Sequence, residues 1–433
     1  MNGFNNLVRI FGKIVGNTDK MPQETQIATG MALIDKGYHV VLKDVNKALE
    51  YCKKNGLDIV ENTFEIANLA QAVCDTLEGK PTGYLAKLDT KQSILLIQSC
   101  ILRDEDALKL LLSNEDVYAL FMNKLNMEGL TRKKTKKVVI PRGYGSEKGV
   151  ITKFKSWGNE KKAYEFFELY AKTLPKCDKF RQIMLDCWQW AKTDYHWLTP
   201  DMGECNQAVQ EDQPENGWVE LCSTFEWITP NKGNCHEKVY IPHKGPKPFG
   251  KKGTRSLGAN CTHSLDGYTL RETERRCSQA DRYMVAWFQL GKPTQDNNIF
   301  CKDPKVEKFY KFWKKTNIAT LRVLEFVSEG DNLPSDYYNA IGRNVKRLPE
   351  RRFDLYFTVH DEFACHINYA DDMQKQFNYI MSEIYQSIYL EYIKEAFEWE
   401  TARWLKPDMA DIELSAINPK TVEAIENSTV IFQ

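Results

Sequence analysis

The sequence predicts an α+β protein in which helices dominate and a few short strands supply the rest of the regular structure. Apolar residues recur at helical spacing through most of residues 2–79, for example in VNKALEYCKKNGLDIV (45–60). In contrast, TGYLAKLD (82–89) and FDLYFTVHDEFACHIN (353–368) alternate apolar and polar residues, as half-buried strands do. At 433 residues the chain is long enough for a large core and for two or three domains.

Charge and hydropathy limit the possible functions. The 59 Lys and Arg residues balance the 59 Asp and Glu residues, so the formal net charge is zero. This neutrality argues against extended DNA wrapping by the chain alone, although basic residues gather at 132–137 and 243–255. No apolar run is long enough to span a bilayer, and no secretion signal is recognisable. We therefore expect a cytoplasmic protein.

The twelve cysteines include no C-x-x-C pair. The best candidate for a zinc cluster has irregular spacing, so free thiols in a reducing compartment are the favoured alternative. The residues of that candidate cluster are Cys205, Cys222, Cys235 and His236.

The first predicted strand ends at a carboxylate, Asp89. A strand end is a suitable place for a metal ligand, and the alternative is that Asp89 caps the helix that follows. The apolar pattern of SILLIQSCILRDEDALKLLL predicts one long helix over 93–112 that packs behind the strand.

The basic stretch TRKKTKKVVIPRGYGS (131–146) predicts a helix with a nucleotide-binding face. On a helix Arg132 and Lys136 share one face, and Tyr144 lies further along it. Arg and Lys can hold phosphate oxygens, and a Tyr ring offers a flat surface to a sugar or base. The alternative is a solvated basic face or a nuclear-localisation-like run. Pro141 is expected to kink the helix.

Two later stretches carry candidate site residues. NCTHSLDGYTLR (260–271) contains His263, which is either a sugar-facing residue or an exposed or capping residue in a turn. The two strands predicted within 353–368 meet at His360, Asp361 and Glu362. Two adjacent carboxylates must be solvated or bound, because leaving them dry and unpaired is costly.

The remaining stretches predict packing rather than chemistry. Residues 155–193 have the spacing of packing helices, and residues 370–403 that of an amphipathic helix. Residues 277–350, with the charged stretch KVEKFYKFWKKTN, are either a solvated surface insertion or a contact with a partner chain or DNA through Lys and aromatic residues.

Taken in order, these stretches resemble the motifs of the phage and mitochondrial type of single-subunit RNA polymerase. Asp89 followed by LRDE (102–105) resembles motif A, the basic stretch with Tyr144 and Gly145 resembles motif B, and His360-Asp361 resembles motif C. HSLDGYTLR (263–271) resembles the signature between motifs B and C, and FEWITP (225–230) resembles a short segment that precedes it.

The resemblance implies a right-hand polymerase fold. Its palm, built on an antiparallel sheet, would comprise 1–105 with the N-terminal helices, then 266–276 and 351–433. A mainly helical fingers subdomain would comprise 106–265, with the insertion at 277–350. The thumb and the N-terminal domain of longer family members are not recognisable in the sequence.

The resemblance also implies the site chemistry. Asp89 and Asp361, with the carbonyl of Thr90, would hold two Mg²⁺ ions. Lys136 and Arg132 would hold the nucleotide triphosphate. Tyr144, Gly145 and His263 would contact the nucleotide and its sugar. His360 and Asp266 would support the site, Asp266 by shaping a turn into the next helix.

The implied function is DNA-templated RNA synthesis from ribonucleoside triphosphates, as in the large subunits of the two-subunit middle-gene polymerases of enquatrovirus-type phages. Expected partners are a DNA template, an RNA product, a smaller companion subunit and a single-stranded-DNA-binding accessory protein. Two alternatives are open. Family A DNA polymerases usually have Glu where Glu362 stands, although Ile94 replaces the Glu that blocks a 2′-hydroxyl in them. A non-catalytic nucleic-acid-binding protein would need neither Asp89 nor Asp361.

Overall fold

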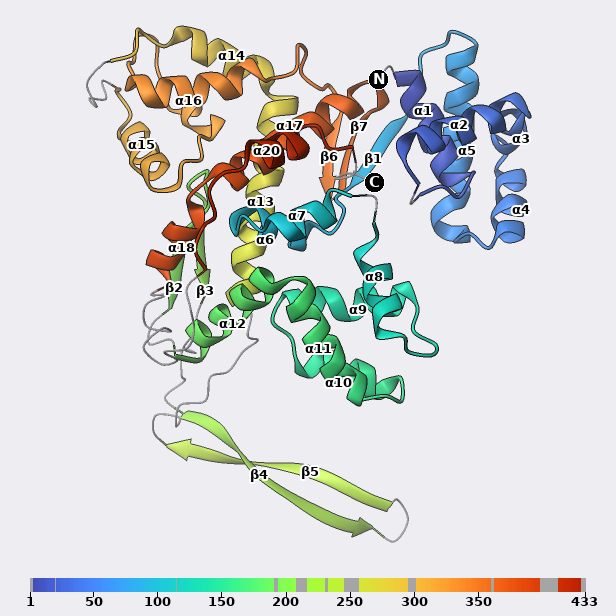
Figure 1. The fold of residues 1–433 in the computed structure, drawn as a ribbon, viewed down its shortest axis with the longest axis vertical. Helices are drawn as coiled ribbons and strands as arrows, with labels where there is room; N and C mark the ends of the chain where they lie inside the picture. The colour runs from blue at the N-terminus through green and yellow to red at the C-terminus, as the bar shows by residue number, and fades with distance from the viewer. Residues whose placement is uncertain are drawn as a thin grey trace.

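A computed structural model describes residues 3–19, 21–113, 115–190, 194–207, 216–229, 233–244, 257–294, 301–359, 362–397 and 412–429. For 216–229 and 233–244, and for residues 61, 188–190 and 359, only the backbone is described. Helices form most of the described structure and surround small antiparallel sheets, which confirms the α+β class (Figure 1).

Five helices precede the first strand in the described residues, where the apolar periodicity predicts mostly helical structure. They pack beside the edge of the main sheet in Figure 1, and α1 packs on both α2 and α5. Glycines allow the close contact of α1 with α2, since a Cβ on Gly12 or Gly30 would collide with backbone atoms of the facing helix. The five helices are α1 (Gly3–Ile14), α2 (Gln23–Asp35), α3 (Tyr38–Leu42), α4 (Val45–Asn55) and α5 (Ile59–Leu77).

The main sheet has three antiparallel strands in the order β1-β7-β6. Strand β1 (Leu85–Asp89) pairs with β7 (Glu362–His366), and β7 pairs with β6 (Tyr356–Val359). The register sets Asp89 directly opposite Glu362. Strands predicted from two distant stretches therefore form one sheet. Buried Ala86, Leu88, Phe363 and Cys365 face the core, and the alternate residues face outward.

The prediction of one long helix over 93–112 is wrong, because the structure has two helices in this stretch. They are α6 (Ser93–Ile101) and α7 (Glu105–Leu111), and Arg103 between them has a positive φ of 45°. The amphipathic stretch near the C-terminus is likewise divided into α17 (Ala370–Gln386) and α18 (Tyr389–Ala396). A continuous apolar pattern therefore does not guarantee a continuous helix.

Helices α6 and α17 pack together behind the sheet, and the next group of helices lies beyond them. This group is α8 (Val117–Leu125), α9 (Arg132–Gly143), α10 (Lys148–Ser156), α11 (Lys161–Thr173) and α12 (Pro175–Trp190). A two-stranded sheet of β2 (Tyr195–Leu198) and β3 (Glu204–Gln207) follows, and then the hairpin of β4 (Asn216–Thr229) and β5 (Gly233–Lys244). FEWIT lies in β4, and Pro230 is outside the described residues.

Helix α13 (Leu257–Ser278) connects the parts of the molecule, since it packs against α6, α12 and α17 (Figure 1). It also passes without a break through the expected boundary between residues 265 and 266. Near the C-terminus, η2 (Ile367–Tyr369) joins β7 to α17, and α20 (Pro419–Glu426) packs on α17.

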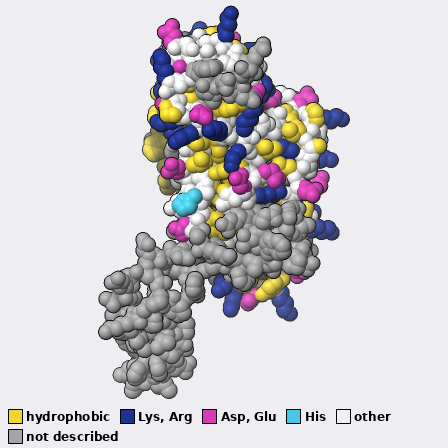
Figure 2. All heavy atoms as spheres, turned by 90° about the vertical axis from the view of Figure 1, so that its left-hand side faces the viewer, with side chains coloured by type: hydrophobic (Ala, Val, Ile, Leu, Met, Phe, Trp, Pro, Cys, Tyr) yellow, Lys and Arg dark blue, Asp and Glu magenta, His cyan; other side chains and the backbone are white. Residues whose placement is uncertain are grey.

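The stretch expected to be an insertion has its own apolar core. Its elements are α14 (Ala280–Gln289), α15 (Pro304–Thr316), η1 (Leu321–Glu325) and α16 (Ser335–Lys346). Aromatic residues such as Trp287, Tyr310 and Tyr337 fill a cluster separate from the main core. Basic and acidic side chains are interspersed on the face seen in Figure 2. Two lysines of α15 form ion pairs, Lys311 with Glu307 and Lys315 with Glu395.

None of the helices in the described ranges combines the length and the apolar character that crossing a lipid bilayer would require.

Candidate functional site

A pocket brings Asp89 and Lys136 together. It has a volume of about 70 Å³ and is lined by the β1–α6 connection, by Tyr118 of α8 and by one side of α9. The lining residues are Asp89, Thr90, Gln92, Ser93, Ile94, Leu95, Tyr118, Lys136, Val139, Ile140 and Gly143. An acidic and a basic residue thus share a small recess whose other walls are both polar and apolar.

Asp89 is exposed at the end of β1, whereas Thr90 beside it is buried. The residue in the cap position of α6 is Gln92, which adopts a left-handed conformation and makes no capping bond through its side chain. Asp89 therefore does not occupy the helix-cap position that was the alternative to a metal ligand. An exposed carboxylate beside a pocket suits a hard cation, which prefers oxygen ligands and retains several waters.

The basic helix forms where it was predicted, as α9. Thr131 caps it by accepting a hydrogen bond from the Lys134 amide (3.3 Å). Lys136 is exposed, and the described part of the chain offers it no ion-pair partner. Its ammonium is thus available to an anion in the pocket.

Arg132 is engaged differently from Lys136. Its guanidinium forms an ion pair with Asp116, the residue that caps α8, and lies 5.3 Å from the centre of the Tyr118 ring. The side chain is still 44% exposed. A phosphate could replace the Asp116 carboxylate as its partner, because Arg binds both groups through the same fork of donors.

Tyr144 and His263 stack on each other, which the sequence could not show. Their ring centroids are 4.7 Å apart and their planes differ by 25°. Tyr144 follows the last residue of α9, and His263 is an exposed residue of α13. The two residues expected at the nucleotide sugar therefore form a single aromatic surface.

A buried amide, Gln98, connects the backbones beside this stack. Its Nε2 donates to the Gly143 carbonyl (3.3 Å) and to Thr262 Oγ1 (3.2 Å), the residues directly before Tyr144 and His263. Gln98 is 1% exposed, and its Oε1 has no partner in the described structure. Sequence reasoning missed Gln98, because a single Gln in an apolar helix carries no signal of a contact across the fold.

The C-terminal end of α9 is held firmly despite Pro141. The helix continues past Pro141 to Gly143, and the Tyr144 amide donates to the Ile140 carbonyl (3.2 Å). Buried Arg142 pairs with Glu147 (3.0 Å) and Asp178 (2.9 Å). Gly145 has a φ of 93°, which favours glycine strongly.

HSLDGYTLR lies within α13, which corrects the expectation of a turn. His263, Asp266 and Gly267 are all helical, so Asp266 does not shape a turn into a following helix. The backbone carbonyl of Asp266 accepts a hydrogen bond from Thr269 Oγ1 (2.7 Å). Because this segment is helical, His263 is held on a rigid element beside Tyr144.

His360 and Asp361 lie outside the described residues. The strands on either side of them form as predicted, with β6 ending at Val359 and β7 beginning at Glu362. Asp361 is thus joined in the chain to the residue that lies opposite Asp89 in the sheet.

The LRDE segment has a structural role. Arg103 donates to the carbonyls of Tyr385 (3.0 Å), Gln386 (3.3 Å), Ser387 (2.7 Å) and Ser415 (2.8 Å). Asp104 caps α7, and Glu105 accepts hydrogen bonds from Tyr385 and Thr421. The break between α6 and α7 therefore binds the C-terminal end of α17 and the segment after α18.

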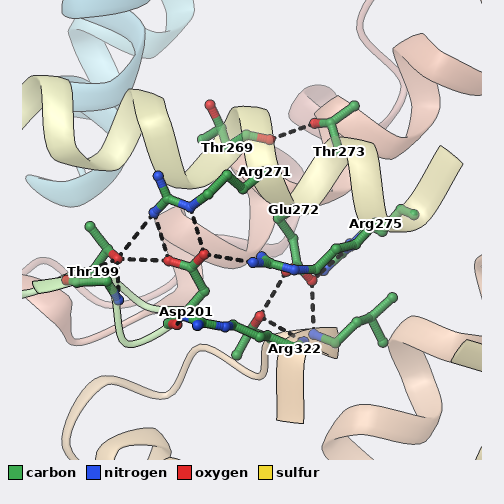
Figure 3. A network of polar contacts seen from close by, with 12 residues as sticks. Thr199, Asp201, Thr269, Arg271, Glu272, Thr273, Arg275 and Arg322 are labelled. Carbon is green, nitrogen blue, oxygen red and sulfur yellow. Dashed lines mark hydrogen bonds and ion pairs between the residues drawn. The ribbon is translucent and has the colours of Figure 1, made fainter. Parts of the chain in front are cut away.

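The clearest feature that the sequence analysis missed is Trp197-Leu198-Thr199-Pro200-Asp201. It has the same Trp-x-Thr-Pro pattern as residues 227–230, which form part of the FEWITP stretch in the resemblance. The Trp197 indole N–H donates to Ser264 Oγ (2.9 Å). The fully buried Asp201 carboxylate accepts from Arg271 (2.8 Å) and Arg275 (3.0 Å), as Figure 3 shows. This segment therefore binds the HSLDGYTLR segment of α13 at both ends.

The electrostatics of Asp201 follow from these contacts. Burial by itself raises the pKa of Asp201, but hydrogen bonds from Arg271 and Thr199 and the charge of Arg275 outweigh burial and lower the pKa to about 2. The Arg322 side chain donates to the Asp201 carbonyl (2.6 Å), and Arg275 also pairs with buried Glu272 (3.2 Å) (Figure 3). The carboxylate is therefore charged at neutral pH and fixes the start of β3 against α13.

Within the described residues, no group of three or more His, Cys, Asp or Glu side chains is arranged to hold a metal ion. For the zinc candidate, Cys205 lies in β3, whereas the side chains of Cys222, Cys235 and His236 lie outside the described structure.

Comparison with known protein families found no family whose sequence model matches this chain, and no characterised protein matches it in sequence.

Proposed function

We propose that the chain is the catalytic subunit of a DNA-templated RNA polymerase that transfers nucleotides from ribonucleoside triphosphates. The observation that carries the proposal is the pocket lined by both Asp89 and Lys136. These residues belong to two separate motifs of the resemblance. A carboxylate that can hold a cation, next to an ammonium that can hold a phosphate, is what nucleotidyl transfer requires.

In this proposal the β1-β7-β6 sheet is the palm and the helices α8 to α12 belong to the fingers. The supporting observation is the antiparallel pairing of β1 with β7, because it puts the strand of the first candidate metal ligand beside the hairpin of the second. The palm interpretation extends to 1–105, 266–276 and 351–433, the fingers to 106–265, and the insertion to 277–350.

Asp89 and Asp361 would hold two Mg²⁺ ions, with the Thr90 carbonyl as a further oxygen ligand. The exposed position of Asp89 at the pocket fits such a role. When bound, the ions would activate the attacking hydroxyl and neutralise charge on the phosphates.

The other site residues would bind and orient the nucleotide. Lys136 would neutralise the departing pyrophosphate, and Arg132 would exchange Asp116 for the γ-phosphate. The stacked rings of Tyr144 and His263 would contact the sugar and the base-pair edge, with Gly145 beside them. Ile94 in the pocket wall would leave room for a 2′-hydroxyl, because it cannot present the carboxylate that excludes one.

The proposed partners are a DNA template, an RNA product and a smaller companion subunit that contributes thumb and N-terminal parts. A single-stranded-DNA-binding accessory protein would then assist promoter opening, in the cytoplasm of a host cell. For the insertion, the separate core and the paired lysines favour a surface module over a DNA contact.

A second candidate is a family A-like DNA polymerase fragment. Glu362 favours it, because it faces Asp89 directly across the sheet and carries a carboxylate where DNA polymerases usually have one. The two candidates differ in the sugar of the nucleotide they would select.

The test is primer extension by the full chain, with and without its companion subunit. An RNA primer annealed to single-stranded DNA would be supplied with Mg²⁺ and either ribonucleotides or deoxyribonucleotides. Asp89→Asn and Asp361→Asn should each lower ribonucleotide addition by a factor on the order of 10³, equivalent to about 4 kcal/mol of barrier. Asp35→Asn, at an exposed carboxylate that ends α2, is the matched control and should retain activity.

The outcomes separate the candidates. Preferential ribonucleotide addition that both variants abolish supports the proposal. Preference for deoxyribonucleotides supports the DNA polymerase candidate. The absence of synthesis under any condition favours a non-catalytic nucleic-acid-binding protein. Synthesis that survives both substitutions contradicts the roles proposed for Asp89 and Asp361.

A further inference from the structure

A second recess lies away from the candidate site, between α5 and the segment 82–87. It has a volume of about 540 Å³, within the range of roughly 300–1,000 Å³ that is typical of ligand-binding pockets. Its lining comes from one side of α5 together with Thr82, Gly83, Tyr84, Leu85 and Lys87. We call this recess the α5–β1 groove.

Strand β1 is an edge strand of the main sheet, since it pairs only with β7 among the described strands. The Ile367 amide donates to the Tyr84 carbonyl (3.2 Å), and this bond shows which residues of β1 are hydrogen-bonded to β7. Pairing to the partner strand alternates along an antiparallel strand, so Ala86 and Leu88 bond to β7. The N–H and C=O groups of Leu85 and Lys87 are consequently directed away from β7. These groups can pair with a further strand.

The side of α5 that lines the groove is mainly acidic and polar, with one large apolar residue, Phe64. Phe64 is 65% exposed although it is a large aromatic residue. Glu65 and Asp75 are partly exposed carboxylates, and Asn68 and Gln71 lie between them at helical spacing. Lys87 is the only basic residue in the lining, so the two carboxylates leave the groove with a formal charge of −1.

This charge selects among possible occupants. A nucleic-acid strand would bring phosphates next to Glu65 and Asp75, so the groove disfavours it. An extended peptide with a basic side chain would meet complementary charge, would pair with the outward groups of Leu85 and Lys87, and could cover Phe64.

We propose that an extended, basic segment of a partner protein binds in the α5–β1 groove and adds to β1 as a fourth strand of the main sheet. Main-chain hydrogen bonds to β1 supply affinity, and the acidic side of α5 supplies the preference for a basic segment. The proposal does not depend on the catalytic role proposed for Asp89 and Lys136, because peptide binding is measured without nucleotides or metal.

The test uses a fluorescently labelled, capped hexapeptide in which valine alternates with lysine, and measures its binding to the full chain by anisotropy. Lys87→Pro removes the outward N–H and leaves the ladder with β7 complete, since that N–H does not bond to β7. Lys87→Ala is the matched control, because it removes the same side chain and keeps the N–H. Relative to Lys87→Ala, Lys87→Pro should weaken binding about fivefold, the effect of one lost hydrogen bond. Circular dichroism would verify that both variants are folded.

The charge preference is tested separately. Asp75→Asn keeps an oxygen that can accept the hydrogen bond from Gln71 (2.8 Å) and removes the charge, so it should weaken binding of the lysine peptide. A peptide with glutamate in place of lysine, and a short RNA, should bind more weakly than the lysine peptide. The proposal is overturned if Lys87→Pro and Lys87→Ala bind equally, if glutamate peptide or RNA binds as tightly, or if the lysine peptide fails to bind at millimolar concentration.

Discussion

Replacing Asp201 by Asn is expected to lower the free energy of unfolding by about 2–3 kcal/mol at pH 7. The ordinary pKa of an Asp carboxyl is 3.8, and the pKa of Asp201 in the folded protein is about 2. This difference of about 1.8, at about 1.36 kcal/mol per pKa unit, corresponds to about 2.4 kcal/mol of folding stability. Removing one partner of a buried ion pair can lower stability by up to about 5 kcal/mol, but we do not expect so large a loss here. The reason is that Arg271 is 44% exposed and can be solvated, and Arg275 retains Glu272 as a partner.

The stabilising effect of Asp201 depends on pH. The folded pKa of Asp201 lies below the unfolded one, so its stabilising effect is complete above about pH 4 and is lost as the pH falls toward 2. Urea denaturation of wild type and Asp201→Asn, followed by circular dichroism between pH 7 and pH 3, measures it. Glu204→Gln, at an exposed carboxylate in the adjacent strand β3, should have little effect. The reasoning is refuted if the two variants lose the same stability, or if the Asp201→Asn difference does not shrink at low pH.

Three further substitutions test contacts around the site. Gln98→Leu removes two hydrogen bonds but also a buried unpaired oxygen, so the net loss should be only about 1 kcal/mol, while NMR should show greater mobility of the Tyr144 and His263 rings; unchanged ring signals would contradict this. Gly145→Ala places a side chain at a φ of 93° and should cost about 1–2 kcal/mol in chemical denaturation, whereas a neutral result would show that the turn relaxes. Arg103→Ala removes four hydrogen bonds to backbone carbonyls, so it should lower the free energy of unfolding by about 3 kcal/mol and increase hydrogen exchange at the end of α17. Unaltered exchange there would contradict the role of Arg103 in holding the end of α17.

Much of the local structure could be predicted from sequence. Alternation of apolar and polar residues predicts β1 and β7, because one face of each strand is buried and the other is more exposed. The same pattern predicts β6, although the apolar Phe357 in this strand is exposed. The basic helix could also be predicted, since Thr131 caps it and its charged residues leave Val138 and Val139 to face the core. Each of these patterns involves residues that are close together in the sequence.

The errors arise where distant contacts override a local pattern. The apolar periodicity of 93–112 continues past the point where the helix stops, because Arg103 takes a left-handed conformation to reach carbonyls near the C-terminus. HSLDGYTLR contains Gly267, which favours a turn, but Ser264 and Arg271 are bound by Trp197 and Asp201, and the segment is helical. The Trp197–Asp201 pattern was visible in the sequence, and only its contacts distinguish it from residues 227–230.

The sequence alone determined the class of the fold, the residues with suitable chemistry and the elements on which they stand, because periodicity and side-chain type are local properties. Only the tertiary structure decided which of these residues meet. It set Asp89 opposite Glu362 and in the same pocket as Lys136, and it stacked Tyr144 on His263. Such contacts depend on how helices and strands far apart in the chain pack over a shared core, and that packing is the sum of many small burial terms that no single motif encodes.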